Sequence, residues 1–216
     1  PSATPSGAAP ETAAELAAAL DLALGATPAA TFSFTGAFTQ SSVSAKASGG
    51  VLTRDAPAED DFRMRVTPFD APRARYVVAG GDLYDDKPGA PAMSLTDQRP
   101  GSAKGYALMV AGMAGPSVIH QLVLHSTEMS RKGRTYSGVL PTARTSGRLR
   151  MLLGGWQEGG SDDNSYLEYK LTIDANNRPA KFVLTWKVPV EGSGSYESVF
   201  TTTYRGWKET GEIFKP

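Results

Sequence analysis

Few residues of this sequence have the types and spacing that catalysis or metal binding requires. The only histidines are His120 and His125, and a separation of five residues would point them in different directions on a helix. Metal-binding histidines on one helix stand three or four residues apart, with a carboxylate nearby. The absence of cysteine excludes disulfides, thiolate metal sites and a cysteine nucleophile. We therefore expect surface or capping roles for the two histidines, and no metal or cofactor.

The short motifs of common enzyme classes are also missing. No serine lies in a Gly-x-Ser-x-Gly turn, no glycine-rich loop is followed by the Lys-Ser/Thr of a phosphate site, and no HExxH occurs. The adjacent carboxylates Asp85-Asp86 and Asp162-Asp163 fall in expected loops, and calcium would need many more oxygen ligands at regular spacing. We expect the protein not to be an enzyme, and a hydrolase is only a third hypothesis.

Charge gives one local signal. Lys plus Arg and Asp plus Glu number 22 each, so the net charge of zero disfavours nucleic acid as a partner. Basic residues concentrate only at Arg144, Arg148 and Arg150, with Arg131, Lys132 and Arg134 nearby in sequence. Two interpretations stay open: a solvated face, or a rim that meets phosphate or anionic lipid head groups.

The clearest local pattern is the stretch Tyr166 to Val188. Apolar residues alternate with polar ones from Leu167 to Ile173 and again from Phe182 to Val188. The intervening residues Asp174 to Pro179 tolerate turns and left-handed backbone, so we predict a β-hairpin with one apolar face. The segments that cover this apolar face decide the function.

The preceding chain reads as a helix followed by a strand meander. Thr12 and Glu15 have capping-box spacing, which predicts a helix from Thr12 to Leu24. Alternation then predicts strands, with a turn at Gly80-Gly81; these strands are Thr31–Phe38, Val43–Leu52, Asp61–Val66, Arg75–Ala79 and Asp82–Asp85. The inward side chains of Val43–Leu52 are small, which suits close packing of a helix but also leaves room for a guest.

The middle of the chain changes to helical periodicity. After a predicted loop from Lys87 to Ser102, apolar stripes predict helices at Ala103–Ala114, after Ser117 as a cap, and at Thr145–Trp156. Five of the six methionines lie between Lys87 and Trp156. Methionine fills cores and also suits surfaces that accept varied apolar partners. Further strands are predicted at Thr127–Val139, interrupted at Lys132-Gly133, and at Tyr196–Tyr204.

These elements predict one α+β domain. Runs of strands that enclose runs of helices are typical of helices gathered on one face of an antiparallel sheet. Residues 1–10, PSATPSGAAP, cannot bury apolar area and read as a flexible tether, which leaves residues 11–216 as a single domain. The sequence contains no apolar run long enough to span a bilayer.

Several segments, taken in order, resemble one known family. These are TFSFTGAF, DFRMRV, GGDLYDD, GPSVIHQLVLHS, GRTYSGVL and LTIDANNRPAKFVLTW. Their order is similar to actinobacterial lipoproteins of the LppX/LprG kind, with the LolA/LolB-like fold, over about Thr12 to Pro216. The family's pattern of an aspartate, a turn and an Arg-Pro before the penultimate strands matches Asp174, Asn176, Asn177, Arg178 and Pro179.

The resemblance implies a strongly curved antiparallel half-barrel whose concave face is covered by helices. It implies a cavity for a lipid or acyl chain, and an extracytoplasmic protein tethered to the outer face of the cytoplasmic membrane by an N-terminal lipidated cysteine. This sequence lacks that cysteine. A buried methylene contributes about 0.8 kcal/mol, so apolar contact alone would hold an acyl chain without specific polar groups.

Two function hypotheses follow, and the middle helices decide between them. The first is an envelope domain that binds or carries lipid, and the second is a ligand-free interaction or signalling module on the same fold, with an envelope protein as partner. Helices that stand off the sheet would leave a lipid site, whereas helices packed tightly would form a core. The predicted lining residues are Phe32, Phe34, Val43, Met64, Leu83, Met109, Met113, Ile119, Leu122, Leu149, Leu152, Leu171, Leu184 and Trp186.

Overall fold

The computed structural model describes residues 9–39, 43–54, 59–95, 102, 104–155, 164–190, 192 and 194–216. Its helices are α1 (Ala13–Ala26), α2 (Gly105–Met113), α3 (Pro116–Leu124), the 3-10 turn η1 (Thr142–Arg144) and α4 (Gly147–Gly155). Its strands are β1 (Ala29–Phe38), β2 (Val43–Leu52), β3 (Asp61–Pro68), β4 (Ala74–Ala79), β5 (Asp82–Asp85), β6 (Met93–Ser94), β7 (Glu128–Lys132), β8 (Thr135–Pro141), β9 (Tyr166–Ile173), β10 (Pro179–Val190) and β11 (Gly194–Lys208).

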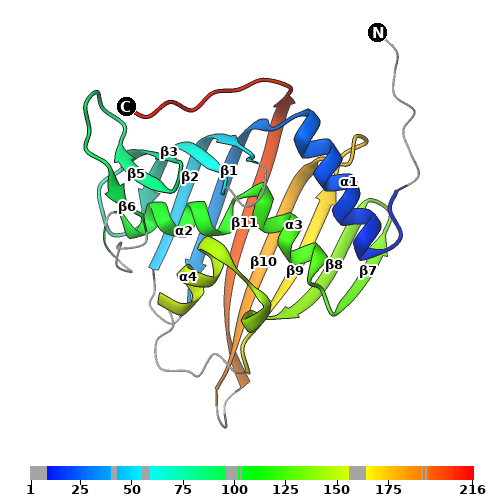
Figure 1. Ribbon diagram of the computed structural model, residues 1–216. Helices are drawn as coiled ribbons and strands as arrows, with labels where there is room; N and C mark the ends of the chain where they lie inside the picture. The colour runs from blue at the N-terminus through cyan, green and yellow to red at the C-terminus, as the bar shows by residue number, and fades with distance from the viewer. Residues whose placement is uncertain are drawn as a thin grey trace.

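All described strands belong to one antiparallel sheet, in which two meanders meet. The sheet order is β6-β5-β4-β3-β2-β1-β11-β10-β9-β8-β7, with 11 strands (Figure 1). The first six strands follow one another along the chain, as do the last five. The two halves are joined by β1 and β11, whose register pairs Phe34 with Thr202 and Gly36 with Phe200. Strands from opposite ends of the chain therefore form the centre of the sheet.

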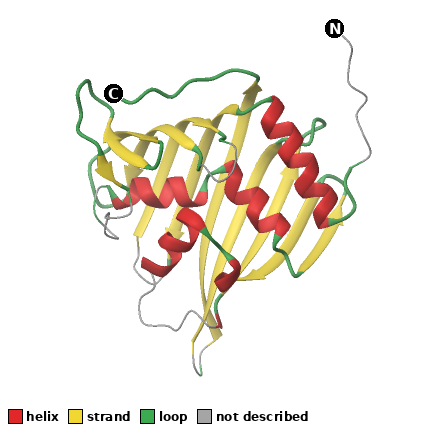
Figure 2. Cartoon of the chain, viewed as in Figure 1, coloured by secondary structure: helices red, strands yellow, loops and turns green. Residues whose placement is uncertain are grey.

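The helices gather on one face of this sheet, as Figures 1 and 2 show. Helix α1 packs against α3, and α4 packs against α2. The predicted α+β class, with helices on one face of an antiparallel sheet, is confirmed. The sheet ends at β6 and β7 and does not close into a barrel.

Helix α1 begins at the capping box that the sequence predicts. The Thr12 hydroxyl accepts a hydrogen bond from the Glu15 amide, and the Glu15 carboxylate accepts one from the Thr12 amide. Two orphan amides at the helix start are thereby satisfied. Backbone bonds to Glu11 and Thr12 hold the pKa of Glu15 below its ordinary value. The helix continues two residues beyond the predicted end.

The predicted hairpin is β9 and β10, and its register places Leu171 opposite Phe182. In the turn, Asn177 has a φ of 60°, the left-handed backbone that asparagine tolerates. The Asp174 carboxylate accepts hydrogen bonds from the Asn176 and Arg178 amides. A second hairpin, β7 and β8, replaces the single interrupted strand predicted from Thr127 to Val139, and its turn lies at Gly133.

Two predictions about the middle helices were wrong in detail. All nine residues of α2 are buried, rather than one stripe, because α2 contacts α4 as well as β3 of the sheet. Ser117 is not the N-cap of α3, since Gly115 is the cap and Ser117 lies inside the first turn. Trp156 and the Asp162-Asp163 pair lie outside the described residues.

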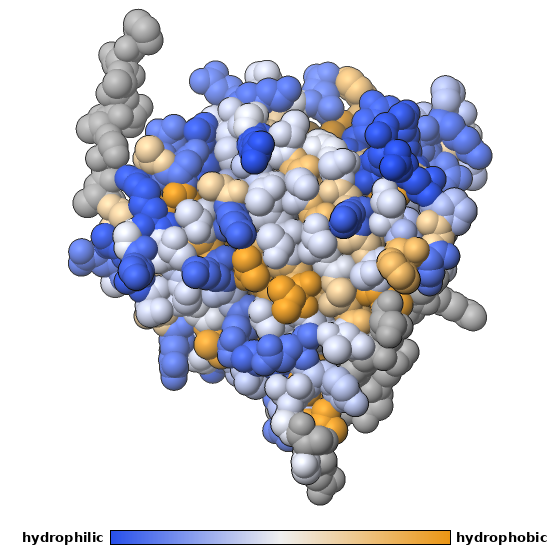
Figure 3. Space-filling view, turned by 180° about the vertical axis from the view of Figure 1, so that it is seen from behind, coloured by the Kyte–Doolittle hydropathy of each residue, from blue (hydrophilic) through white to orange (hydrophobic). Residues whose placement is uncertain are grey.

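The outer face of the sheet is mostly polar. Exposed positions of β1 are Thr31, Ser33, Thr35 and Ala37. On β11, Val199 is an apolar exception that is 45% exposed. Figure 3 shows this face from behind, with a small group of orange side chains near the centre of a pale and blue surface. The helices therefore cover the apolar face alone.

Close approach of β2 and β3 makes one glycine necessary. A Cβ on Gly49 would lie 2.0 Å from the Arg63 carbonyl oxygen and 2.8 Å from Met64 Cα, whereas a Cβ on Gly50 would have nothing within 4 Å. Both contacts at Gly49 are with backbone, so no side chain can move aside. A side chain is therefore excluded at Gly49 and can be accommodated at Gly50.

We expect Gly49→Ala to lower the free energy of unfolding by about 1–3 kcal/mol, because β3 would have to shift. Gly50→Ala is the matched control, and we expect it to be neutral or stabilising by about 0.5–1 kcal/mol. Urea unfolding of both variants measures the difference. Equal effects of the two substitutions would contradict the close approach of these strands.

Candidate functional site

The predicted lining residues come together in one buried cluster between the sheet and the helices. Met109, Met113, Ile119, Leu122, Leu149 and Leu152 come from the helices, and the other eight come from the concave face of the sheet. Val43 is the most exposed of the fourteen at 9%, and the others are exposed by 4% or less. Side chains around an open cavity would expose surface to a water-sized probe. In this conformation, therefore, the helices pack directly on the sheet.

Aromatic side chains contribute more to this interface than the sequence analysis predicted. Tyr106 and Tyr136 are fully buried and were not among the predicted lining residues. Phe38 packs edge-on against Trp186, with ring centroids 5.9 Å apart. The alternation of apolar and polar residues in GRTYSGVL could have identified Tyr136 as buried. The helical period of α2 could have identified Tyr106 in the same way.

Four tyrosine hydroxyls attach the helices to the sheet near the helix ends. Tyr204 Oη on β11 donates to the Ala114 carbonyl after α2 at 2.8 Å, and Tyr136 Oη on β8 donates to the Pro10 carbonyl before α1 at 3.0 Å. Tyr169 Oη on β9 lies 2.8 Å from Ser126 Oγ after α3. Tyr106 on α2 donates to the Asp70 carboxylate, and burial with this bond raises its pKa to about 12. Polar attachments thus lie around the rim of an apolar interface.

A run of three acidic residues, Glu59 to Asp61, forms a further polar attachment between the sheet and the helices. Asp60 Oδ2 accepts hydrogen bonds from the Ser117 amide at 2.9 Å and the Ser117 hydroxyl at 2.8 Å, at the start of α3. Glu59 accepts the Arg148 amide at the start of α4. Each carboxylate therefore compensates the exposed amides at the start of a different helix. We call this segment the acidic clamp.

Arg148 completes the acidic clamp from the helical side. Its Nε lies 3.0 Å from Glu59 Oε2, close enough for an ion pair although the N–H is not aligned for a hydrogen bond. Its Nη1 donates to the Asp60 carbonyl at 3.2 Å. The side chain is 3% exposed, so the prediction that Arg148 belongs to a head-group rim is wrong. The sequence concealed this because the partners lie about 90 residues away.

The other two predicted rim residues lie outside the interface. Arg144 is exposed at the end of η1, and Arg150 is half-buried with Nη1 3.5 Å from the Thr142 carbonyl. His120 is half-buried and His125 is exposed at the end of α3. In the described part of the chain, no group of three or more His, Asp or Glu residues lies close enough to hold a metal ion.

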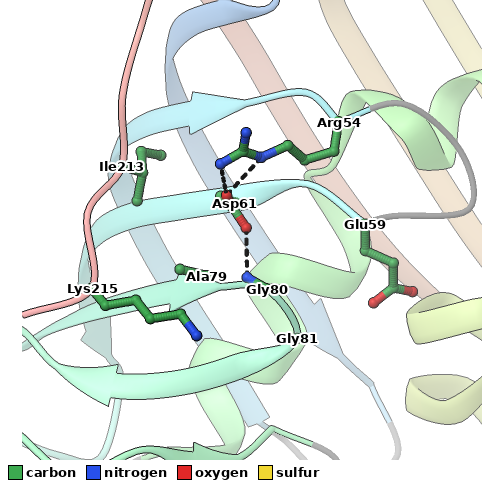
Figure 4. Close-up of a pocket in the computed structure, with 8 residues that line it drawn as sticks. All are labelled: Arg54, Glu59, Asp61, Ala79, Gly80, Gly81, Ile213 and Lys215. Atoms are coloured by element: carbon green, nitrogen blue, oxygen red, sulfur yellow. Dashed lines mark hydrogen bonds and ion pairs between the residues drawn. The ribbon is translucent and has the colours of Figure 1, made fainter.

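Asp61 links the acidic clamp to a pocket at the edge of the interface. Its carboxylate accepts hydrogen bonds from the Arg54 guanidinium and, at 2.9 Å, from the Gly80 amide (Figure 4). The pocket has a volume of about 460 Å³ and is open to solvent. Ile213 and Lys215 of the C-terminal segment form its far side. None of the fourteen predicted lining residues contacts this pocket.

A second pocket lies on the outer face of β7 to β10. It has a volume of about 470 Å³ and is lined by Glu128, Ser130, Val139, Lys170 and Thr185, among others. It is a groove open to solvent, mainly on the side of the sheet away from the helices, and its lining mixes charged, polar and apolar side chains. None of the fourteen predicted lining residues contacts it, and the apolar interface remains the candidate site.

Comparison with known proteins supports this fold. The crystal structure of LprF from Mycobacterium bovis covers 97% of this chain and 99% of its own, with a TM-score of 0.50 and 13% sequence identity. The chain has the fold of LprF. At that identity the likeness concerns fold alone, and the fold predicted from the LppX/LprG resemblance is confirmed.

Other comparisons add little. A dehydratase-cyclase domain from ambruticin biosynthesis has a TM-score of 0.20 and 12% identity, over 89% of this chain and 81% of its own, and carries no argument. No protein-family model and no curated protein matches the sequence.

No single described helix is long and apolar enough to cross a membrane. Among the described helices, only α2 and α3 taken together meet the criteria of length and composition, and the two are bent by 52°.

Burial of Asp60 predicts a specific pH dependence. Desolvation raises its pKa from 3.8 to about 6, against the opposing effects of Ser117 and Arg148. Between these values the folded protein holds a proton that the unfolded chain releases, so stability from this group is greatest at low pH and is lost as pH rises through 6. We expect wild type to lose up to about 3 kcal/mol relative to Asp60→Asn between pH 4 and pH 7.

Urea unfolding of both proteins across this range measures the difference. Ser117→Ala serves as the comparison, because loss of its hydroxyl bond should move the transition to higher pH. Parallel stability curves for wild type and Asp60→Asn would show that Asp60 does not titrate in this window.

Proposed function

We propose that this chain binds an acyl-chain lipid between the concave face of the sheet and the helices. One observation carries the proposal: the indole N–H of Trp186 is buried in the apolar interface and has no hydrogen-bond partner among the described residues. A buried unpaired donor lowers stability by about 1–3 kcal/mol, and such groups are rare in folded proteins. A carbonyl or carboxylate oxygen on a bound lipid would satisfy it.

The surroundings of Trp186 suit the rest of such a ligand. Its strand β10 also carries Phe182, Leu184 and Val188 on the same apolar face. The same buried cluster also includes methionine and leucine side chains of α2 and α4. Methionine adapts to varied apolar shapes, so this layer can repack around a chain. The expected ligand is therefore an ester or acid with at least one long acyl chain.

In this conformation the helices are packed tightly, which is the arrangement expected of a core. The lipid proposal therefore requires a second conformation in which the helices move off the sheet. Acyl methylenes would replace the side-chain contacts that opening removes, and each would return about 0.8 kcal/mol. The observed affinity would then be the intrinsic affinity reduced by the fraction of molecules in the open state. Apolar contacts in the middle of the interface do not depend on orientation, so they oppose movement of the helices less than hydrogen bonds and ion pairs do. Its polar attachments, above all the acidic clamp, govern opening.

The place of this activity is the cell envelope. The LprF fold supports a lipoprotein-like domain over residues 11–216, held outside the cytoplasmic membrane by residues 1–10 and an N-terminal lipid anchor. Residues 1–8 lie outside the described part. Arg144 is the exposed rim residue that would meet a head group. The domain is proposed to carry lipid and not to catalyse a reaction.

A second function remains, favoured by the low exposure of the fourteen lining residues. A filled interface is also what a ligand-free interaction module would have, with an envelope protein bound at the surface. In that case the helices would stay on the sheet. The two functions differ in whether any lipid enters.

Organic extraction of the purified protein followed by mass spectrometry tests for a bound lipid. After delipidation, we expect cis-parinaric acid to bind one per chain, with a rise in its fluorescence. Absence of both extracted lipid and probe binding would overturn the lipid proposal and support the ligand-free module.

Trp186→Phe tests the polar contact. Loss of the donor should weaken binding of cis-parinaric acid by about tenfold, the equivalent of one hydrogen bond. Trp207→Phe is the matched control, because Trp207 Nε1 already donates to the Pro179 carbonyl at 2.8 Å. It should leave probe affinity unchanged. Equal affinities of wild type and Trp186→Phe would contradict the assigned contact, even where the probe binds.

A further inference from the structure

Strand β7 forms an edge of the sheet, at the right of Figure 1. Among the strands that the structure describes, it pairs with β8 and with no other. Glu128, Ser130, Arg131 and Lys132 are exposed, and Met129 is half-buried. An edge strand of this kind presents backbone donors and acceptors to a further strand.

The hairpin turn fixes which backbone groups point outward. A two-residue loop, Gly133 and Arg134, joins β7 to β8, and Lys132 pairs with Thr135 across it. Gly133 has a φ of 62°, as the first position of a type II′ turn requires. In such a hairpin the closing pair exchanges hydrogen bonds, and the pattern then alternates along the strands. The amides and carbonyls of Met129 and Arg131 therefore point to the open edge.

We propose that β7 pairs with β7 of a second copy of this chain, antiparallel about a two-fold axis at Ser130. In this register Met129 of each copy exchanges backbone hydrogen bonds with Arg131 of the other. Both residues present their backbone groups to the edge, so the pairing satisfies the alternation on both strands. The two sheets become continuous, and the interface is self-complementary as two-fold symmetry requires.

Side-chain charge selects this register over its neighbours. It places Glu128 opposite Lys132 twice, once on each side of the axis, on the outer face of the sheet. A shift toward the turn would place Arg131 opposite Arg131. A shift the other way would leave Glu128 opposite Ser130 and would match no charges. Opposite charges across strands stabilise a pair, and like charges destabilise it.

The side chain of Arg131 does not obstruct the edge. Its Nη1 donates to the Ala9 carbonyl at 2.8 Å and to the Pro10 carbonyl at 3.1 Å, on the side where Tyr136 also reaches Pro10. Charged residues on a short edge strand discourage pairing with arbitrary strands. In β7 the charges reverse in sign along the strand, so they match their own copy when it runs antiparallel.

Charge exchange within β7 tests the proposal on the full chain. Sedimentation velocity at low salt, over a range from about 1 to 300 μM, should show a monomer–dimer equilibrium. Glu128→Lys or Lys132→Glu alone should weaken the dimer by about tenfold, because two ion pairs become two repulsions. The double variant should restore wild-type association. Lys46→Glu, an exposed charge reversal on β2, is the control and should change nothing.

A cysteine at the axis gives a second, geometric test. Directly opposed residues that exchange no hydrogen bonds have Cα atoms about 4.5 Å apart, within disulfide range. The natural chain has no cysteine, so Ser130→Cys should form a disulfide-linked dimer on mild oxidation. Glu128→Cys should not, because its copy lies several residues away. A monomer at all concentrations, a dimer indifferent to the single charge reversals, or equal crosslinking of both cysteine variants would each overturn the proposal.

Discussion

The pairing of β1 with β11 is the constraint on which the rest of the structure depends. Each meander alone would be a sheet with one apolar face and a long exposed edge. Their union in the centre, where the rings of Phe34 and Phe200 stack 6.4 Å apart, creates one concave surface wide enough for the α-helices that the structure describes. Helices α2 and α3 lie between the two meanders in sequence, α1 precedes the first meander and α4 lies within the second, so the central pair closes only after the whole helical layer has been made. Non-local pairing of this kind is slow to form because it closes a long loop.

The interface between helices and sheet separates two kinds of interaction. Its middle is apolar and non-directional, and its stability follows from area removed from water. Its margin is polar and directional, through the tyrosine hydroxyls and the acidic clamp. Such a division would let one margin contact break without exposing unpaired groups in the interior. The indole N–H of Trp186 is a donor inside the apolar part, and no described group accepts its hydrogen bond.

The acidic clamp concentrates several helix ends at one point of the sheet. Three consecutive residues accept hydrogen bonds from the backbone of α3, α4 and the turn after β4. Arg148 on α4 forms an ion pair with Glu59. Burial of a carboxylate is unfavourable unless its hydrogen bonds compensate, and for Asp60 they do so only partly, as its raised pKa records. The clamp therefore positions the helices, while the desolvation of Asp60 offsets part of the stabilisation that its hydrogen bonds provide. This offset would lower the free energy needed to open the helical layer for a lipid.

What the sequence determined by itself was local. Alternation located β2 within its exact residues and the hairpin of β9 and β10, because successive side chains on a strand point to opposite faces. Thr12 and Glu15 located the start of α1, because a capping box involves only the first turn. What only the tertiary structure decided was long-range. Burial of all of α2 needs α4, the role of Arg148 needs Glu59 and Asp60, and whether the fourteen apolar residues enclose space or fill it depends on how closely two layers approach. No periodicity within one segment records the distance to another.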